Sequence, residues 1–141
     1  MERLRLPAKL ASLASFREFV DRAAVAAGAG PELLLRMELV LEELLVNHTL
    51  HAYGSAEGDS EVACFCRAPG YFCLEVADEA APFDPLGLAS PDLSLAPRDR
   101  PIGGLGIHLV RSLADEINYR REAGKNVITV CFALVPAASS D

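Results

Sequence analysis

The strongest structural signal in this chain lies in residues 38–53, which read ELVLEELLVNHTLHAY. Here and just upstream, apolar residues recur at spacings of three and four, the pattern of a helix with one broad buried stripe. The members of that stripe are Leu34, Met37, Leu41, Leu44 and Leu45. Pro31 suits the first turn of such a helix, because the N–H that proline lacks has no partner there. We therefore expect a long helix from Pro31 through Tyr53.

Three polar residues on this helix follow one another at intervals of four: Glu43, Asn47 and His51. That spacing stacks them on one face, one turn apart. A carboxylate beside an amide oxygen suits proton handling and the hard oxygen coordination of magnesium. A solvated polar stripe would have the same spacing. Asn47 speaks against that alternative, since asparagine is unfavourable inside a helix and apolar residues flank it on both sides.

The rest of the chain divides into short elements. We expect a strand at 3–6, a helix at 12–27, strands at 61–67 and 71–78, a helix at 104–117, and strands at 117–122 and 127–135. Pairing Arg67 with Tyr71 makes one face of the first hairpin wholly apolar and puts Cys73 on the other face, across from Phe65. The order β-α-α-β-β-α-β-β predicts an α+β two-layer sandwich, a mixed or antiparallel sheet with helices on one face.

Two further segments are candidates for ligand binding. Asp78 ends an apolar strand, and an ionised carboxylate, which only accepts hydrogen bonds, matches an exocyclic amine such as that of adenine. A plain strand-ending aspartate in a turn is the alternative. Residues 102–107 read IGGLGI before the last expected helix, where glycines and a helix N-terminus would admit phosphate. A glycine hinge is the alternative, since the spacing matches neither a dinucleotide fingerprint nor a P-loop.

Composition limits the classes of partner. The net charge is −7, which disfavours nucleic acid and anionic membranes. No apolar run approaches the roughly 20 residues of a membrane span, and no signal peptide is evident, so we expect a cytoplasmic protein. Cys64, Cys66, Cys73 and Cys131 form no Cys-x-x-Cys pair, so we expect free thiols and no zinc. The length suits a single domain, 1–141, with a tail at 136–141.

Taken together and in this order, these motifs resemble the GHKL ATPase superfamily, and most closely its anti-sigma factor and serine kinase branch. Residues 38–53 resemble the N box of that family. Residues 78–85 resemble its first glycine box, and residues 101–113, PIGGLGIHLVRSL, resemble its second. The resemblance covers nearly the whole chain and implies an ATP-binding fold of the Bergerat type.

The resemblance implies a role for each matching residue. Glu43 would be the base that takes the proton from a protein hydroxyl, and Asn47 would ligate magnesium with ATP. Asp78 would accept a hydrogen bond from adenine, and Thr129 would support the adenine site through water. The phosphates would lie against Gly103, Gly104 and Gly106. Residues 79–103, rich in proline, would be the ATP lid.

One motif departs from the family pattern. Ala80 and Pro82 stand where the first glycine box has glycines. If the Ala80 position needs a positive φ, alanine there costs about 1 kcal/mol, roughly fivefold in affinity. This departure affects how tightly ATP would bind, while the fold would remain the same.

The function that this resemblance implies is an ATP-dependent serine/threonine protein kinase of the partner-switching type. Its partners would be an anti-sigma-factor antagonist-like protein and a sigma factor, and a homodimer is compatible with the family. An ATP-binding switch that sequesters a partner without phosphoryl transfer is the first alternative. A metal-binding or purely structural α+β domain is the second, and nucleotide binding would exclude it.

Overall fold

The structure, a computed structural model, describes residues 2–47, 58–79 and 104–134. Five strands form one sheet in the order β1-β2-β3-β5-β4, and every neighbouring pair is antiparallel. The strands are β1 (Glu2–Pro7), β2 (Asp59–Arg67), β3 (Tyr71–Asp78), β4 (Glu116–Glu122) and β5 (Lys125–Ala133). A short 3₁₀ turn, η1 (Leu10–Ser12), leads into the first of three helices. These are α1 (Leu13–Ala26), α2 (Pro31–Asn47) and α3 (Gly104–Leu113).

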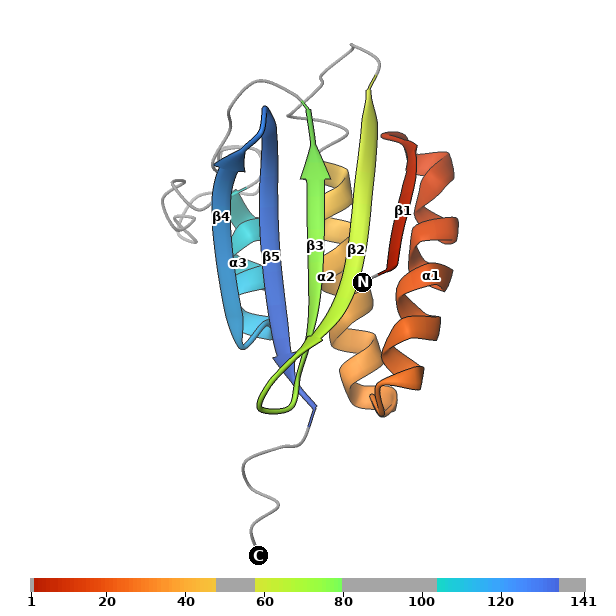
Figure 1. Cartoon of the computed structure of the whole chain (residues 1–141), viewed down its shortest axis with the longest axis vertical. Helices are drawn as coiled ribbons and strands as arrows, with labels where there is room; N and C mark the ends of the chain where they lie inside the picture. Colours follow the sequence, from red (N-terminus) through yellow and green to blue (C-terminus); the bar gives the residue numbers. More distant parts are fainter. Residues whose placement is uncertain (1, 48–57, 80–103, 135–141) are drawn as a thin grey trace, which may run out of the picture.

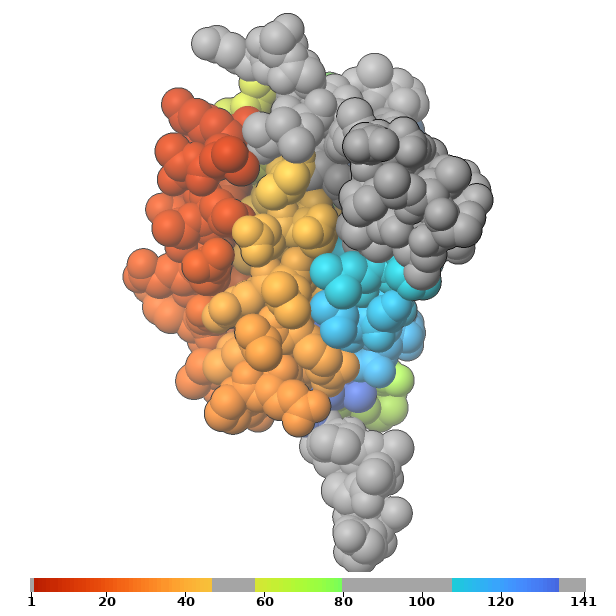
Figure 2. Space-filling model, turned by 180° about the vertical axis from the view of Figure 1, so that it is seen from behind, coloured from red at the N-terminus to blue at the C-terminus, as the bar shows by residue number. Residues whose placement is uncertain are grey.

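All three helices cover the same face of the sheet (Figure 1). Seen from the helix side, they lie next to one another, with α2 between α1 and α3 (Figure 2). The core lies between the two layers, where buried side chains of α1 and α2 meet alternate residues of the central strands. The largest of them are Phe16, Met37, Leu41, Leu44, Phe72, Leu74, Ile128 and Phe132. The expected two-layer α+β sandwich is thus confirmed, with a sheet that is antiparallel rather than mixed.

The expected register of the first hairpin is confirmed. Arg67 pairs with Tyr71, and Cys73 lies across from Phe65. Because side chains alternate along a strand, the even-numbered residues of β3 point to the helices and the odd-numbered ones to the opposite face, which we call the outer face.

The last helix is shorter than expected. It ends at Leu113, whereas the sequence suggested Ile117. Ile117 instead belongs to β4, where it pairs with Val130 of β5. The turn before β4 is held by Asp115, whose carboxylate accepts a hydrogen bond of 2.7 Å from the backbone N–H of Ala133. The expected end of α2 at Tyr53, the lid at 79–103 and the tail at 136–141 lie outside the described residues, save Glu79.

The expectation of free thiols is wrong for two of the four cysteines. Cys73 and Cys131 form a disulfide, with their Cα atoms 4.1 Å apart, while Cys64 and Cys66 are free. The physical reason is the β3–β5 register, which places Cys73 directly opposite Cys131. Sequence spacing within the first hairpin contains no information about that pairing.

The β4–β5 turn offers a test of the local backbone. Ala123 and Gly124 connect paired Glu122 and Lys125, and both have positive φ, 51° and 78°. Two such residues make a type I′ turn, which favours Asn-Gly. Ala123→Asn should therefore stabilise the protein by about 0.5–1 kcal/mol, measured by urea unfolding. Gly124→Ala should destabilise it. An Ala123→Asn protein no more stable than the wild type would contradict this description of the turn.

A pair of carboxyl groups between α1 and α2 predicts a dependence on pH. Burial, then the hydrogen bond and the charge of Glu38, raise the pKa of Asp21 to about 6, although Arg17 opposes the shift. Asp21 Oδ1 is itself buried without a hydrogen-bond partner. Because the folded pKa lies above the unfolded one, Asp21 contributes stability at low pH that is lost as the pH rises through about 6.

Asp21→Asn should therefore stabilise the protein by about 1 kcal/mol at pH 7.5, after allowance for solvent screening. The gain should disappear near pH 4, where the native aspartate is protonated as well. Urea unfolding at both pH values measures the difference. Glu18→Gln, an exposed change on the same helix, should have no such effect. Equal effects of Asp21→Asn at the two pH values would show that the ionised carboxyl pair does not destabilise the folded protein at neutral pH.

Candidate functional site

Asp78 is held in a fixed orientation at the end of β3. It is 3% exposed, and Asn126 Nδ2 donates a hydrogen bond of 2.9 Å to its Oδ1. Tyr119 in turn donates from its hydroxyl to Asn126 Oδ1 at 2.7 Å. Asp78 and Asn126 are direct partners in the β3–β5 register, and both belong to the face of the sheet that the helices cover. The three side chains therefore form one chain of hydrogen bonds that ends on a buried carboxylate.

Buried polar groups are costly unless they are hydrogen-bonded, so such a chain fixes its members in place. A carboxylate oriented in this way presents an acceptor to a ligand that donates, and the exocyclic amine of adenine is such a donor. The sequence analysis missed Asn126 and Tyr119. The sign in the sequence was Asn126, a polar residue directly before the apolar residues of β5. Its role becomes clear only once the β3–β5 register is known.

Thr129 does not support this site. As an odd-numbered residue of β5, it pairs with Glu75 on the outer face, on the opposite side of the sheet from Asp78. Its hydroxyl accepts a hydrogen bond of 3.3 Å from Arg120 Nη1, and Arg120 also contacts Glu75 at 3.4 Å. The proposed water-mediated role of Thr129 is therefore corrected: Asn126, three residues earlier and on the helix face, is the β5 residue that contacts Asp78.

Glu43 lies in the last turns of α2 and is half-buried. Burial raises its pKa above the ordinary value, and the neighbouring charge of Glu42 adds to the shift. A carboxylate with a raised pKa binds a proton more readily, which suits a general base. Asn47 is the last residue of α2, one turn beyond Glu43. Its backbone is thus placed next to Glu43 along the helix, while the position of its side chain is not described.

Helix α3 brings the glycine segment to the same end of the molecule. Gly104 and Gly106 form its first turn, whereas Gly103 lies outside the described residues. Near the other end, Arg36 of α2 donates a hydrogen bond of 3.1 Å to the backbone carbonyl of Leu113, the last residue of α3. This contact pairs the early part of α2 with the end of α3, so the two helices run antiparallel.

Consequently the end of α2, the start of α3 and the Asp78 end of β3 lie at one edge of the domain (Figure 1). The residues present fit an adenine nucleotide. The buried acceptor Asp78 is 3% exposed, and the N-terminus of α3, with its free N–H groups and positive dipole end, suits phosphate. No cluster of three metal-ligating side chains occurs among residues 2–47, 58–79 and 104–134.

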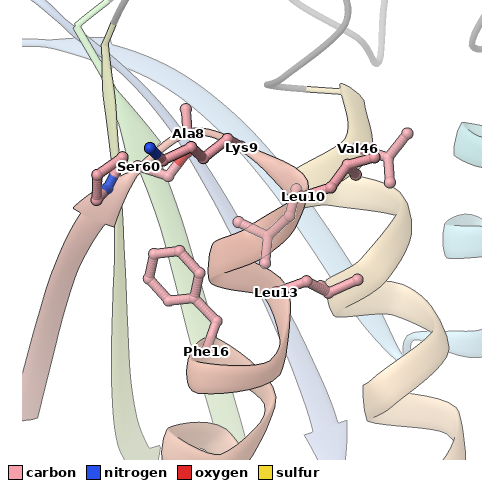
Figure 3. Close-up of a pocket in the computed structure, with 9 residues that line it drawn as sticks. Ala8, Lys9, Leu10, Leu13, Phe16, Val46 and Ser60 are labelled. Carbon is pink, nitrogen blue, oxygen red and sulfur yellow. The ribbon is translucent and has the colours of Figure 1, made fainter.

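A hollow lies between the start of α1 and the end of α2, away from Asp78 and Glu43 (Figure 3). Most of the residues that line it are apolar, among them Leu10, Leu13, Phe16 and Val46. Lys9 and the buried Ser60 are the polar residues of its lining, which includes neither Asp78 nor Glu43. Because none of the candidate nucleotide-binding residues lines this hollow, we do not assign the nucleotide to it. As to membranes, none of the helices among the described residues has the length and apolar character that a span requires.

Comparison with known proteins agrees with this geometry. Residues 6–132 match the family model of the histidine kinase-like ATPase domain. The chain is 30% identical over 98 residues to the serine/threonine-protein kinase BtrW of Bordetella bronchiseptica, a match that covers 68% of this chain and 69% of that protein.

The fold is also similar to the crystal structure of the RsbU and RsbW domains of Rv1364c from Mycobacterium tuberculosis, with a TM-score of 0.62 and 15% identity. That similarity covers 97% of this chain but only 34% of the other, so the chain spans about a third of that larger protein. The family model matches most of the chain, from the end of β1 to β5. The chain therefore belongs to the histidine kinase-like ATPase domain family.

Proposed function

We propose that this protein is an ATP-dependent serine/threonine protein kinase that phosphorylates a partner protein, as partner-switching anti-sigma factors do. The observation that carries the proposal is the buried Asp78 carboxylate, fixed by Asn126 at the same edge of the domain as the end of α2 and the start of α3. The similarity to a serine/threonine-protein kinase and to a structure containing an RsbW domain supports the same choice.

In the proposed reaction, Asp78 accepts a hydrogen bond from the adenine amine and so positions the nucleotide. The backbone of Gly103, Gly104 and Gly106 lies against the phosphates. Asn47 and the nucleotide would hold magnesium, which would supply neutralisation of the charge on the phosphates. The hydroxyl oxygen of a partner serine or threonine then attacks the γ-phosphorus, the bond to the ADP oxygen breaks, and Glu43 takes the hydroxyl proton.

The similarity to a serine/threonine-protein kinase and to a structure with an RsbW domain supports a partner-switching role. We propose an anti-sigma-factor antagonist-like protein as the phosphorylated partner and a sigma factor as a second binding partner, in the cytoplasm, with a homodimer as a compatible assembly. The competing function is an ATP-binding switch that sequesters its partner without phosphoryl transfer. For the kinase and for the switch alike, Ala80 and Pro82 in place of glycines in the first glycine box lead us to expect weak nucleotide binding.

Phosphotransfer separates the two functions. The tagged protein would be used to isolate partners from its native cells, and mass spectrometry would identify them. Each purified partner would then be incubated with the kinase, γ-labelled ATP and magnesium. Label on a serine or threonine of a partner that binds directly would support the kinase. A partner that binds stoichiometrically but never gains label would favour the switch.

A further inference from the structure

The disulfide between Cys73 and Cys131 lies on the outer face of the sheet, opposite the face that the described helices α1, α2 and α3 cover. Groups on such a face are normally open to water, yet Cys73 is 0% and Cys131 3% exposed. Part of this burial comes from neighbouring strands. The rest comes from side chains on the outer face: Phe65 lies directly across from Cys73, and Arg67 contacts Cys131.

Arg67 and Glu116 form the part of this cover that lies at Cys131, since Arg67 contacts its sulfur and Glu116 is its partner in the β4–β5 register. Their side chains are joined by two hydrogen bonds, of 2.9 Å and 2.6 Å. Arg67 belongs to β2 and Glu116 to β4, so the ion pair reaches across β3 and β5, the two strands that the disulfide joins. The guanidinium stacks 4.6 Å from the centre of the Tyr71 ring, and its Nη1 lies 3.8 Å from Cys131 Sγ. We call Arg67, Glu116 and Tyr71 the strap.

The strap can open without any change in the fold. The side chains of Arg67 and Glu116 are 41% and 49% exposed, and an ion pair that water reaches this easily is weak. The strand pair beneath it is held by the backbone ladder from Tyr71–Ala133 to Asp78–Asn126. Moving the Arg67 side chain therefore removes its contact with Cys131 Sγ while β3 and β5 stay paired.

Arg67 also affects the chemistry of the sulfur that it contacts. A guanidinium beside a sulfur atom stabilises the thiolate, which is both the better leaving group when a disulfide is reduced and the nucleophile when it forms again. Cys64 has the opposite environment, since burial raises the pKa of its thiol to about 12 and it lies in the core. The four cysteines thus comprise one buried thiol, Cys64, one exposed thiol, Cys66, and a pair that lies beside a cation.

We propose that Cys73 and Cys131 are a reversible redox pair and that the strap controls the access of oxidants and reductants to their sulfur atoms. In oxidation, the Cys131 thiolate attacks a hydroperoxide and becomes a sulfenic acid, releasing water or an alcohol. The Cys73 thiol then attacks that sulfur, and a second water leaves as the disulfide forms. Reduction needs a dithiol, which gives up two electrons and two protons and becomes a disulfide itself. The proposal goes beyond kinase function and does not depend on it.

The first test measures reduction of the folded protein by dithiothreitol, with thiols trapped by iodoacetamide and located by mass spectrometry. Glu116→Gln removes the anchor of the strap but keeps the cation, so Cys73 and Cys131 should become alkylated at least about threefold faster than in the wild type. Glu122→Gln is the matched control, because it removes an exposed β4 carboxylate that pairs with Arg120 instead. It should leave the rate unchanged.

Two results would overturn the proposal. One is an equal rate in Glu116→Gln and the wild type. The other is reduction that proceeds only as fast as global unfolding, which would make the disulfide a permanent crosslink.

The second test runs the reaction in the other direction. The reduced protein is treated with hydrogen peroxide, and the disulfide should re-form in the folded state. Cys73→Ser removes the resolving thiol, so Cys131 should accumulate as a sulfenic acid that dimedone captures. A fully reduced pair after peroxide treatment of the wild type, or no dimedone adduct on Cys131 in the variant, would contradict the proposal.

Discussion

Glu43→Gln is expected to lower the rate of phosphotransfer to a partner protein by about 10²- to 10⁴-fold, the usual loss when a general base is removed. Glutamine is nearly isosteric with glutamate but cannot take the hydroxyl proton. Glu43 is also the residue on α2 whose pKa is raised by burial, which makes it a stronger base than an exposed glutamate. Nucleotide affinity should change by less than about 1 kcal/mol, or fivefold.

Glu42→Gln is the matched control for this variant. Glu42 is adjacent to Glu43 but is rotated by about 100° around the helix, so its loss should leave phosphotransfer near the wild-type rate. The rate should also fall at acidic pH, because Glu43 must be ionised to act and its pKa lies above the ordinary value. Initial rates with γ-labelled ATP measure both effects. A Glu43→Gln protein that phosphorylates at the wild-type rate would show that another group takes the proton.

The second large effect is expected at the adenine site. Asp78→Asn should weaken the binding of ATP and ADP at least tenfold, or about 1.4 kcal/mol. Asn126 already donates an N–H to this side chain. An asparagine at position 78 would turn its oxygen to Asn126 and direct its own NH₂ towards the ligand. Two donors would then face each other where the wild type has a donor and an acceptor.

Glu61→Gln is the control, since Glu61 is a β2 carboxylate that pairs with Arg3 outside the nucleotide-binding motifs and should not affect nucleotide affinity. Because Asp78 is buried, the unfolding temperature of each variant must also be measured, so that loss of binding is not confused with loss of fold. An Asp78→Asn protein that is folded and binds ATP as tightly as the wild type would show that adenine is recognised elsewhere.

Whether a feature could be predicted from the sequence depends on how far apart in the chain its interacting residues lie. The α2 stripe and the register of the β2–β3 hairpin depend on residues close in sequence, and the structure confirms both. The roles of Asn126 and Thr129 depend on the pairing of β3 with β5. These strands are neighbours in the sheet but distant in the chain. Because side chains alternate between the two faces of a strand, only this pairing shows that Asn126 shares a face with Asp78 and that Thr129 does not.

The same limit explains the disulfide. Cys73 and Cys131 are 58 residues apart, and no local pattern indicates that they face each other. The end of the last helix was also set by distant contacts. Arg36 meets the final carbonyl of α3, and β5 recruits Ile117 into the sheet. The motif resemblance predicts one site at the end of α2, the end of β3 and the start of α3, but only the fold shows that Asn126 lies beside Asp78.

The most direct test of the central claim is calorimetric titration of the wild-type protein with ATP in the presence and absence of magnesium. The proposed site predicts one nucleotide per chain, with a dissociation constant in the micromolar range or weaker, and tighter binding with magnesium than without it. No detectable binding at millimolar ATP with magnesium would contradict both the adenine site at Asp78 and the proposed kinase function.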